Sequence, residues 1–254
     1  MKTLKKGSVL LVALLLIMSF AYAQSEQPSM FVVHTDNVKF DKMAKYEELS
    51  KQLKDACEKH NVEGTNWTAI TVEDGRYVYV SPITSMADLD NSPLGNLGKK
   101  MGNDNLSNML AEMDQCYDSH YDYVIHHSAD LSYLPKGYST EGKSTREYHF
   151  LYYSPKNAAA MKEAMAGIKN VYKTKGIKNG YNVYHSGFGS EEAYYMVEVA
   201  GEDTTSIAMG GKANSEILGD EGKAALFGII QLASRYDQVN GEFREDLSYY
   251  PSND

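Results

Sequence analysis

The chain has 254 residues, 43% of them hydrophobic and 23% charged, which is the composition of a folded globular protein rather than a disordered one. Its 34 acidic residues outnumber its 25 basic ones, and the net charge of −9 argues against nonspecific nucleic-acid binding, which needs Lys and Arg against phosphate. Two cysteines exclude a disulfide-rich scaffold and a four-cysteine metal site, whereas 20 tyrosines are an unusually high count.

Residues 1–23 have the pattern of a secretory signal peptide. Three lysines lie among the first six residues, the segment 9–18 is uniformly apolar, and Ala21 and Ala23 are the small residues that precede a cleavage site. The apolar segment is shorter than the roughly 20 residues of a membrane-spanning helix. We therefore expect cleavage near Ala23 and a soluble protein, secreted or periplasmic, with no membrane segment in its mature form. Its 22 basic and 34 acidic residues would give the mature chain a net charge of −12.

The first half of the expected mature chain, residues 24–135, alternates between two periodicities. Short apolar and β-branched runs predict strands, and apolar stripes with a period of 3.6 predict helices. Asp74-Gly75 marks a tight hairpin turn. The expected elements are a strand at 30–35, a helix at 41–60, strands at 67–72 and 76–83, a helix at 106–117 and a strand at 121–127.

A linker at 136–145, rich in Gly, Ser and Thr, leads into the second half, residues 146–254, where the same order returns. Long loops are expected at 84–105 and 201–222, at the same place in the two halves. The expected elements are a strand at 148–153, a helix at 161–172, strands at 181–186 and 193–199, a helix at 224–233 and a strand at 238–243.

A short sequence also returns. Asp130 to Tyr133 is Asp-Leu-Ser-Tyr, and the same four residues run from Asp246 to Tyr249, at an offset of 116. Each half has the order β-α-β-β-α-β of a ferredoxin-like unit. We predict an α+β protein of two ferredoxin-like repeats packed sheet to sheet as a pseudo-dimeric α/β barrel. In this order and repetition the chain resembles the tandem, single-chain form of the dimeric α/β-barrel superfamily, over nearly all of its mature length.

Cys57 and Cys116 each lie near the end of a predicted helix, at the same end of the first unit. After export they would form a disulfide worth about 3–4 kcal/mol, or they would stay as two free buried thiols. Helix axes lie about 8–10 Å apart, whereas the Cα atoms of a disulfide must come within about 7 Å. Both alternatives are open at this stage.

The tyrosines and histidines of the predicted strands are the candidate functional residues. Tyrosine packs well on strands, so core filling is one interpretation, and the other is a lumen of apolar rings with hydroxyl tips that binds a small apolar or aromatic molecule. The candidate ligand-binding residues are His34, Trp67, Tyr79, His126, Tyr152 and His185.

No spacing of His, Cys or acidic residues indicates a metal site, and no motif indicates a bound cofactor. The resemblance implies two kinds of enzyme: monooxygenases of the antibiotic-biosynthesis type, which oxidise aromatic substrates without a bound cofactor, and haem proteins such as the chlorite dismutases and dye-decolourising peroxidases. The haem proteins use a histidine from a helix of the second half. Here that half contains only His149 and His185, both on predicted strands, which argues against haem.

Three functions are therefore open: a noncatalytic small-molecule binder, a cofactor-independent monooxygenase-like enzyme, and a structural or interaction protein whose lumen is filled. The helix at 224–233 is apolar nearly all round, so it contacts either another part of the chain or its counterpart in a homodimer.

Overall fold

The computed structural model describes residues 29–92 and 94–252, so the predicted signal peptide lies outside the described residues. The strands are β1 (Met30–Val38), β2 (Thr68–Val72), β3 (Arg76–Ile83), β4 (Tyr117–His127), β5 (Thr145–Tyr152), β6 (Asn182–Ser186), β7 (Tyr194–Gly201) and β8 (Arg235–Phe243). The α-helices within the described residues are α2 (Met43–Lys59), α3 (Gly95–Met101), α4 (Asn103–Asp114), α5 (Ala158–Lys175) and α6 (Thr204–Leu232). None of them is long and apolar enough to cross a membrane.

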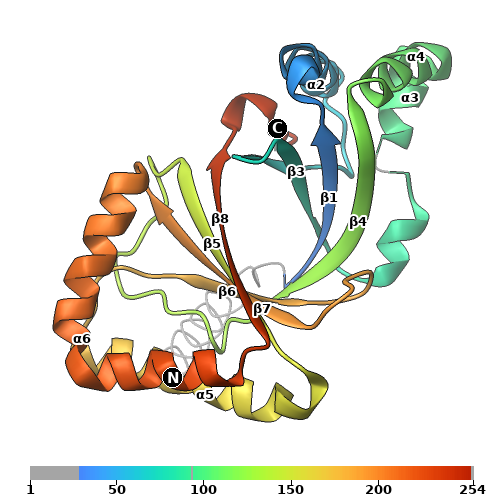
Figure 1. Ribbon diagram of the computed structural model, residues 1–254. Coiled ribbons are helices and arrows are strands. Elements are labelled where there is room, and N and C mark those ends of the chain that lie inside the picture. Colours follow the sequence, from blue (N-terminus) through green and yellow to red (C-terminus); the bar gives the residue numbers. More distant parts are fainter. Residues whose placement is uncertain (1–28, 93, 253–254) are drawn as a thin grey trace, which may run out of the picture.

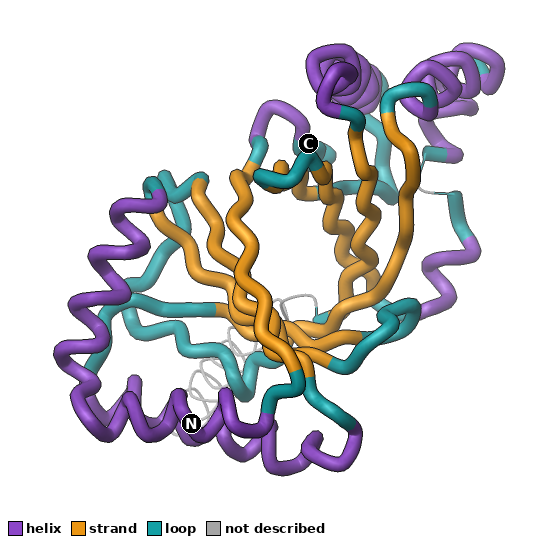
Figure 2. Tube along the Cα trace, viewed as in Figure 1, coloured by secondary structure: helices purple, strands orange, loops and turns teal. Residues whose placement is uncertain are grey.

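The strands form a closed barrel in the order β1-β3-β2-β8-β5-β7-β6-β4, and every neighbouring pair is antiparallel. The helices lie outside the ring of strands, with α2, α3 and α4 beside the first four strands and α5 and α6 beside the last four (Figures 1 and 2). The α+β class and the barrel architecture expected from the sequence are confirmed.

Two seams close the barrel. β2 pairs with β8, where Ile70 lies opposite Phe243, and β4 pairs with β6, where His126 lies opposite His185. The two groups of four strands therefore join edge to edge, which differs from the sheet-to-sheet packing predicted above. Edge pairing satisfies the N–H and C=O groups that open sheet edges would leave free.

Each strand has one face toward the barrel interior, which we call the lumen, and one toward the helices. Two apolar cores fill the space between strands and helices: Tyr46 and Leu49 of α2 belong to the first, and Met161 and Met165 of α5 to the second. A third cluster lines the lumen. Its buried members are Val33, Ile125, Tyr148, Tyr194 and Met196.

The structure corrects three expected element boundaries. The loop expected at 84–105 contains α3, and α4 begins at Asn103. Most of the loop expected at 201–222 is helical, because α6 begins at Thr204 under a capping box in which Asp203 accepts the N–H of Ser206. The backbone leaves the helical conformation within α6 at Gly219, where φ is 59°. The fourth strand begins at Tyr117 rather than at 121, which places His120 on β4.

The two Asp-Leu-Ser-Tyr segments each pack on the opposite half of the chain. The hydroxyl of Ser132 accepts the N–H of Val183 at 2.8 Å, and that of Ser248 accepts the N–H of Ala69 at the same distance. The hydroxyl of Tyr133 donates to the carbonyl of Ile177 at 2.8 Å. Likewise, the hydroxyl of Tyr249 donates to the carbonyl of Val62 at 2.9 Å.

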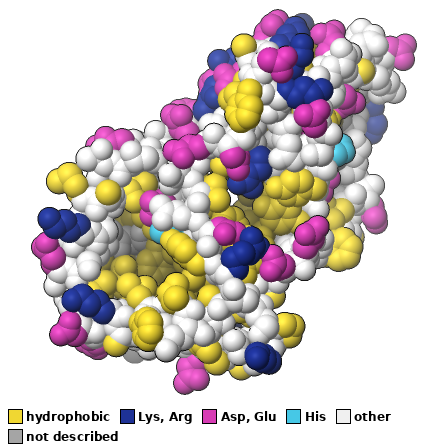
Figure 3. All heavy atoms as spheres, viewed as in Figure 1, with side chains coloured by type: hydrophobic (Ala, Val, Ile, Leu, Met, Phe, Trp, Pro, Cys, Tyr) yellow, Lys and Arg dark blue, Asp and Glu magenta, His cyan; other side chains and the backbone are white. Residues whose placement is uncertain are grey.

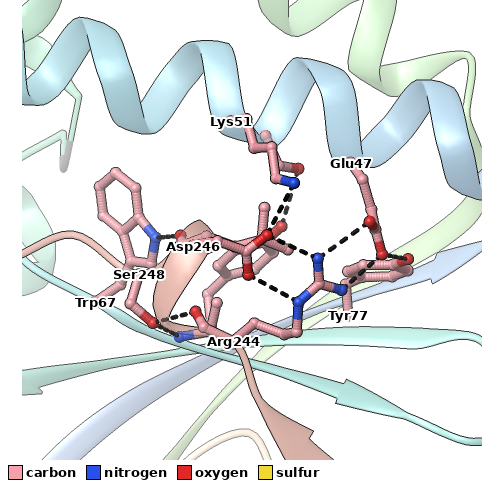
Figure 4. A network of polar contacts seen from close by, with 11 residues as sticks. Glu47, Lys51, Trp67, Tyr77, Arg244, Asp246 and Ser248 are labelled. Atoms are coloured by element: carbon pink, nitrogen blue, oxygen red, sulfur yellow. Dashed lines mark hydrogen bonds and ion pairs between the residues drawn. The ribbon is translucent and has the colours of Figure 1, made fainter.

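A charged network fixes the second of these segments to α2 (Figure 4). Arg244 forms bidentate contacts to Glu47, at 2.6 and 3.1 Å, and to Asp246, at 2.8 and 2.9 Å. Lys51 adds an ion pair to Asp246 at 2.9 Å, and the indole of Trp67 donates to the carbonyl of Leu247 at 2.7 Å. The end of the second half is thus tied to the first helix of the first half.

Cys57 and Cys116 are both buried in the first apolar core, and both are free thiols in the structure. Burial raises the pKa of the Cys57 thiol to about 11, so this group is protonated at neutral pH.

Candidate functional site

Aromatic side chains line the lumen. Tyr148, Phe150 and Tyr152 are alternate residues of β5 and belong to the lumen cluster, as does Tyr194 of the adjacent strand β7. The ring centroids of Phe150 and Tyr194 lie 5.3 Å apart, and those of Tyr152 and Tyr194 lie 5.6 Å apart, in edge-to-face geometry. Figure 3 shows a hollow over the barrel with hydrophobic side chains on its walls and charged side chains around its rim.

The hydroxyl of Tyr148 is an unsatisfied polar group within this apolar lining. Tyr148 is 8% exposed, and its hydroxyl has no hydrogen-bond partner among the described residues. Burial raises its pKa well above the ordinary value of 10, so the phenol stays neutral. A buried donor without an acceptor destabilises the fold by about 1–3 kcal/mol, and an acceptor atom placed in the lumen would remove that cost.

An ion pair lies at one end of the lumen. The Nε of Arg146 is 3.0 Å from Oε1 of Glu198, and both side chains are largely buried. Oε2 of Glu198 accepts the amide of Asn182 at 3.2 Å and the hydroxyl of Tyr184 at 3.3 Å. Nη1 of Arg146 donates to the carbonyl of Lys143 in the linker at 2.5 Å. The pair is charge-neutral, and hydrogen bonds hold it in place.

A groove of about 860 Å³ opens at this end of the barrel. The linker segment 139–144 forms one side, and Lys54 and Glu58 of α2 form another. Arg146 and Phe243 lie where the groove meets the barrel, with the guanidinium carbon 5.9 Å from the ring centroid. The remaining lining residues are Thr68, Glu245, Ser248 and Tyr250.

A second arginine covers Tyr152. The guanidinium carbon of Arg235 lies 3.7 Å from the centroid of the Tyr152 ring, a cation–π contact. Arg235 also pairs with Asp237 at 2.8 Å and with Glu192. This contact fixes the orientation of the Tyr152 ring within the lumen cluster.

The structure separates the six predicted ligand-binding residues. Only Tyr152 belongs to the lumen cluster. Trp67 and Tyr79 belong to the core under α2. His34 lies on that same face of β1, and His126 and His185 lie on the helix-facing side of β4 and β6. The placement of these five residues in the lumen is thus corrected, because their neighbours in the sequence, such as Val33, Ile125 and Tyr184, face inward instead.

The two histidine groups have different environments. His126 and His185 stack with centroids 4.9 Å apart, and burial together with the charge of His126 lowers the pKa of His185. His34 lies 3.1 Å from Asp36 and 2.8 Å from Asp122. Burial opposes its protonation, but hydrogen bonds and charge from these two carboxylates outweigh that effect and raise the pKa of His34 to about 9.

Sequence reasoning missed Tyr148, Arg146 and Glu198. The alternation of residues along β5 could have identified Arg146. Every second residue lies on the same face, so this face contains Arg146, Tyr148, Phe150 and Tyr152. The expected strand began at 148 and excluded Arg146. The structure also brings together His34, Asp36 and His120, a group that spacing along the sequence did not indicate.

No family model matches the chain, and no curated protein matches it. Solved structures with a similar fold include an anthrone oxidase-like protein, with a TM-score of 0.58, 10% identity and coverage of 87% of this chain and 93% of that one. A putative monooxygenase from Lactobacillus acidophilus NCFM has a TM-score of 0.53, 7% identity and coverage of 89% and 98%. A chlorite dismutase variant from Candidatus Nitrospira defluvii has a TM-score of 0.53, 9% identity and coverage of 87% and 94%. At these identities the likeness concerns the fold, and it agrees with the dimeric α/β-barrel superfamily expected from the sequence.

Proposed function

We propose that this chain is an exported, soluble protein that binds a small aromatic molecule in the barrel lumen. The observation that carries the proposal is the buried Tyr148 hydroxyl, a neutral donor without an acceptor in an aromatic lining. Protein interiors satisfy nearly all buried polar groups, so an unpaired one in the aromatic lining of the barrel indicates where a ligand atom belongs. Export is checked by the N-terminal sequence of the mature protein, which should begin at Gln24.

The charges of the lumen indicate the chemistry of the ligand. Arg146 and Glu198 neutralise each other at the groove end, so this pair leaves no net charge for an ionised ligand. The Tyr148 hydroxyl donates a hydrogen bond and therefore requires an acceptor oxygen or nitrogen. A neutral aromatic ketone, quinone or phenol fits both requirements, because its rings pack on Phe150 and Tyr194 while its oxygen accepts from Tyr148.

The test uses prodan, a neutral naphthyl ketone whose fluorescence shifts to shorter wavelength in apolar surroundings. Titration of the purified protein should give a saturable blue shift, and Tyr148→Phe should weaken binding about 2- to 10-fold, as expected for the loss of one hydrogen bond. Tyr195→Phe is the matched control. It removes the same hydroxyl group from a tyrosine of β7 that is next to the lumen residue Tyr194 but whose side chain packs in the core under α5 instead of in the lumen. Absence of the shift, or equal effects of the two substitutions, would favour the structural role with a filled lumen.

A cofactor-independent monooxygenase-like enzyme is the second candidate. The similar folds of a putative monooxygenase and an anthrone oxidase-like protein favour it. Anthrone is a suitable test substrate, because its conversion to anthraquinone consumes one O₂ and releases one water. Oxygen uptake with anthraquinone formation would move the assignment from binder to enzyme, and the carboxylate of Glu198 would then be the candidate base for the carbon-bound proton.

The proposal includes the origin of the lumen in two ferredoxin-like repeats. The strand order is β4-β1-β3-β2 in the first half and β8-β5-β7-β6 in the second. The two orders match when each strand of the first half is compared with the strand four places later in the chain. Ser132 and Ser248 make corresponding bonds, as do Tyr133 and Tyr249. These correspondences support a duplication in which each copy supplies half of the lumen wall.

A further inference from the structure

Four ionisable side chains form a square on the helix-facing side of β1 and β4. In the antiparallel register of these strands, Asp36 lies opposite His120 and His34 lies opposite Asp122. Residues directly opposite each other share a face, and so do residues two apart on one strand. One ligand atom from each of His34, Asp36 and His120 lies within 4.8 Å of the other two.

Asp36 is the buried corner of this square. Its side chain is 4% exposed, and Oδ2 accepts a hydrogen bond from the hydroxyl of Tyr46 on α2. Oδ1 has no hydrogen-bond donor among the described residues, and it faces Nε2 of His34 at 3.1 Å. Burial of a carboxylate is costly, so this atom needs a cationic partner: the protonated imidazole of His34, or a metal ion that takes the place of its proton.

The spacing of these atoms suits a metal ion. Two ligands bound to one ion at about 2.0–2.2 Å lie roughly 3.0–3.5 Å apart, and the 3.1 Å between Nε2 and Oδ1 falls in that range. The imidazole of His120 is exposed, so side-chain rotation can bring it toward the other two ligands. Its exposure also supplies a path by which an ion enters.

Partners outside the site orient the ligands. The Nδ1 of His34 donates to Asp122 at 2.8 Å, so an ion that displaces the proton of Nε2 meets a lone pair already directed at the site. Tyr46 holds the carboxylate of Asp36, and the ring of Tyr117 stacks on His120 with centroids 5.6 Å apart. A carboxylate–histidine–metal arrangement of this kind is common in protein metal sites.

We propose that His34, Asp36 and His120 bind a divalent transition-metal ion, with Asp122 and Tyr46 as the residues that position the ligands. Two imidazoles and one carboxylate favour Zn²⁺, Fe²⁺ or Mn²⁺ over the oxygen-preferring Ca²⁺ and Mg²⁺. Three protein ligands leave a coordination position for water or a bound anion. The site lies on the opposite face of β1 from the lumen, so it is independent of the proposed aromatic ligand.

The experiment is a Zn²⁺ titration of untagged full-length protein after chelator dialysis, followed by calorimetry and by thermal unfolding. Wild type should bind a single equivalent, and Zn²⁺ should raise its melting temperature. Asp122→Asn should weaken binding by about 10- to 100-fold, the usual effect of losing a partner that orients a ligand, and His120→Ala should weaken it further. His120 is exposed, so its replacement leaves the fold intact, and the melting temperature without Zn²⁺ checks this.

His185→Ala is the matched control, because His126 and His185 are another close histidine pair of the described residues. This variant should bind Zn²⁺ as wild type does. Co²⁺ gives a second measurement: visible d–d absorption of low-symmetry coordination should appear in wild type and be lost in His120→Ala. The proposal is overturned if no Zn²⁺ binds, if His120→Ala binds as tightly as wild type, or if His185→Ala abolishes binding.

Discussion

At the scale of single residues, two tyrosines with equal burial have opposite hydrogen-bonding states. Tyr148 and Tyr133 are each 8% exposed. The hydroxyl of Tyr133 donates to the carbonyl of Ile177, whereas that of Tyr148 has no partner among the described residues. The first hydroxyl therefore stabilises the fold, and the second destabilises it in the ligand-free protein.

We expect Tyr148→Phe to raise the free energy of unfolding by about 1 kcal/mol, because it removes an unsatisfied buried hydroxyl without leaving a cavity. Tyr133→Phe should lower it by about the same amount, since it leaves the Ile177 carbonyl without its donor. Urea unfolding of the ligand-free proteins measures both values. A loss of stability in Tyr148→Phe equal to that in Tyr133→Phe would show that the Tyr148 hydroxyl has a partner.

The sequence showed which residue types are abundant on the strands, but it did not show what each residue does. The excess of tyrosines on strands was visible, and Tyr152 belongs to the lumen cluster. Trp67 was taken for a ligand contact, but its indole bonds to Leu247 and fixes the C-terminal segment. Strand periodicity shows that neighbouring residues face opposite ways, but when both faces are partly apolar it does not show which face is inward.

At the scale of elements, Arg244 connects the end of β8 to α2 and to Asp246. Hydrogen bonds from this guanidinium lower the pKa of Glu47 and hold the pKa of Asp246 far below its usual range, against the opposing effect of burial. A carboxyl group whose pKa is lowered in the folded state stabilises the protein above its unfolded pKa. That contribution disappears as the pH falls through the folded pKa.

We expect Arg244→Gln to destabilise the protein by about 1–2 kcal/mol at pH 7, after allowance for solvent screening at the partly exposed Asp246. The difference from wild type should shrink below about pH 4, where both carboxyl groups protonate in the variant and the unfolded chain. Arg235→Gln is the control, since Arg235 also contacts two carboxylates but is more exposed, and its effect should be smaller. Urea unfolding at pH 7 and pH 3 measures these differences, and a gap that widens at pH 3 would contradict the assignment.

The sequence predicted the end of a helix well where its capping residue was clear, and poorly where other residues obscured the cap. Gly176, with φ of 66°, ends α5 close to the end of the predicted helical stripe. The capping box at Asp203 and Ser206 also lay in the sequence, but the glycines that follow in 210–222 suggested a loop. Packing of α6 against α5 outweighs the low helix propensity of those glycines.

At the scale of the whole molecule, the two seams and the exchanged Asp-Leu-Ser-Tyr segments make each half depend on the other. Tyr249 packs against Trp67 in the first core, and Tyr133 packs against Tyr181 in the second. The apolar core of each half is therefore incomplete without the Asp-Leu-Ser-Tyr segment of the other half. The exposed side chains of Leu226, Phe227 and Ile230 lie on the helix expected at 224–233, where the homodimer contact stays a prediction.

We expect the protein to unfold in one cooperative transition. Fluorescence of Trp67, which reports on the contact with Tyr249, and far-UV circular dichroism, which reports on the whole chain, should give the same midpoint in urea. Calorimetric and van't Hoff enthalpies should agree. Two separated transitions would mean that the halves are independently stable and that the seams contribute little.

The sequence by itself determined the order of strands and helices and the aromatic character of the barrel, because these properties depend on periodicity and composition within short segments. Only the tertiary structure decided which faces turn inward, how the halves join, and that His34, Asp36 and His120 lie together. Those properties depend on the register between strands far apart in the chain, and spacing along one strand contains no information about that register. Several of the many tyrosines thus line the lumen, whereas the histidines first assigned to it lie on the helix-facing side of the same strands.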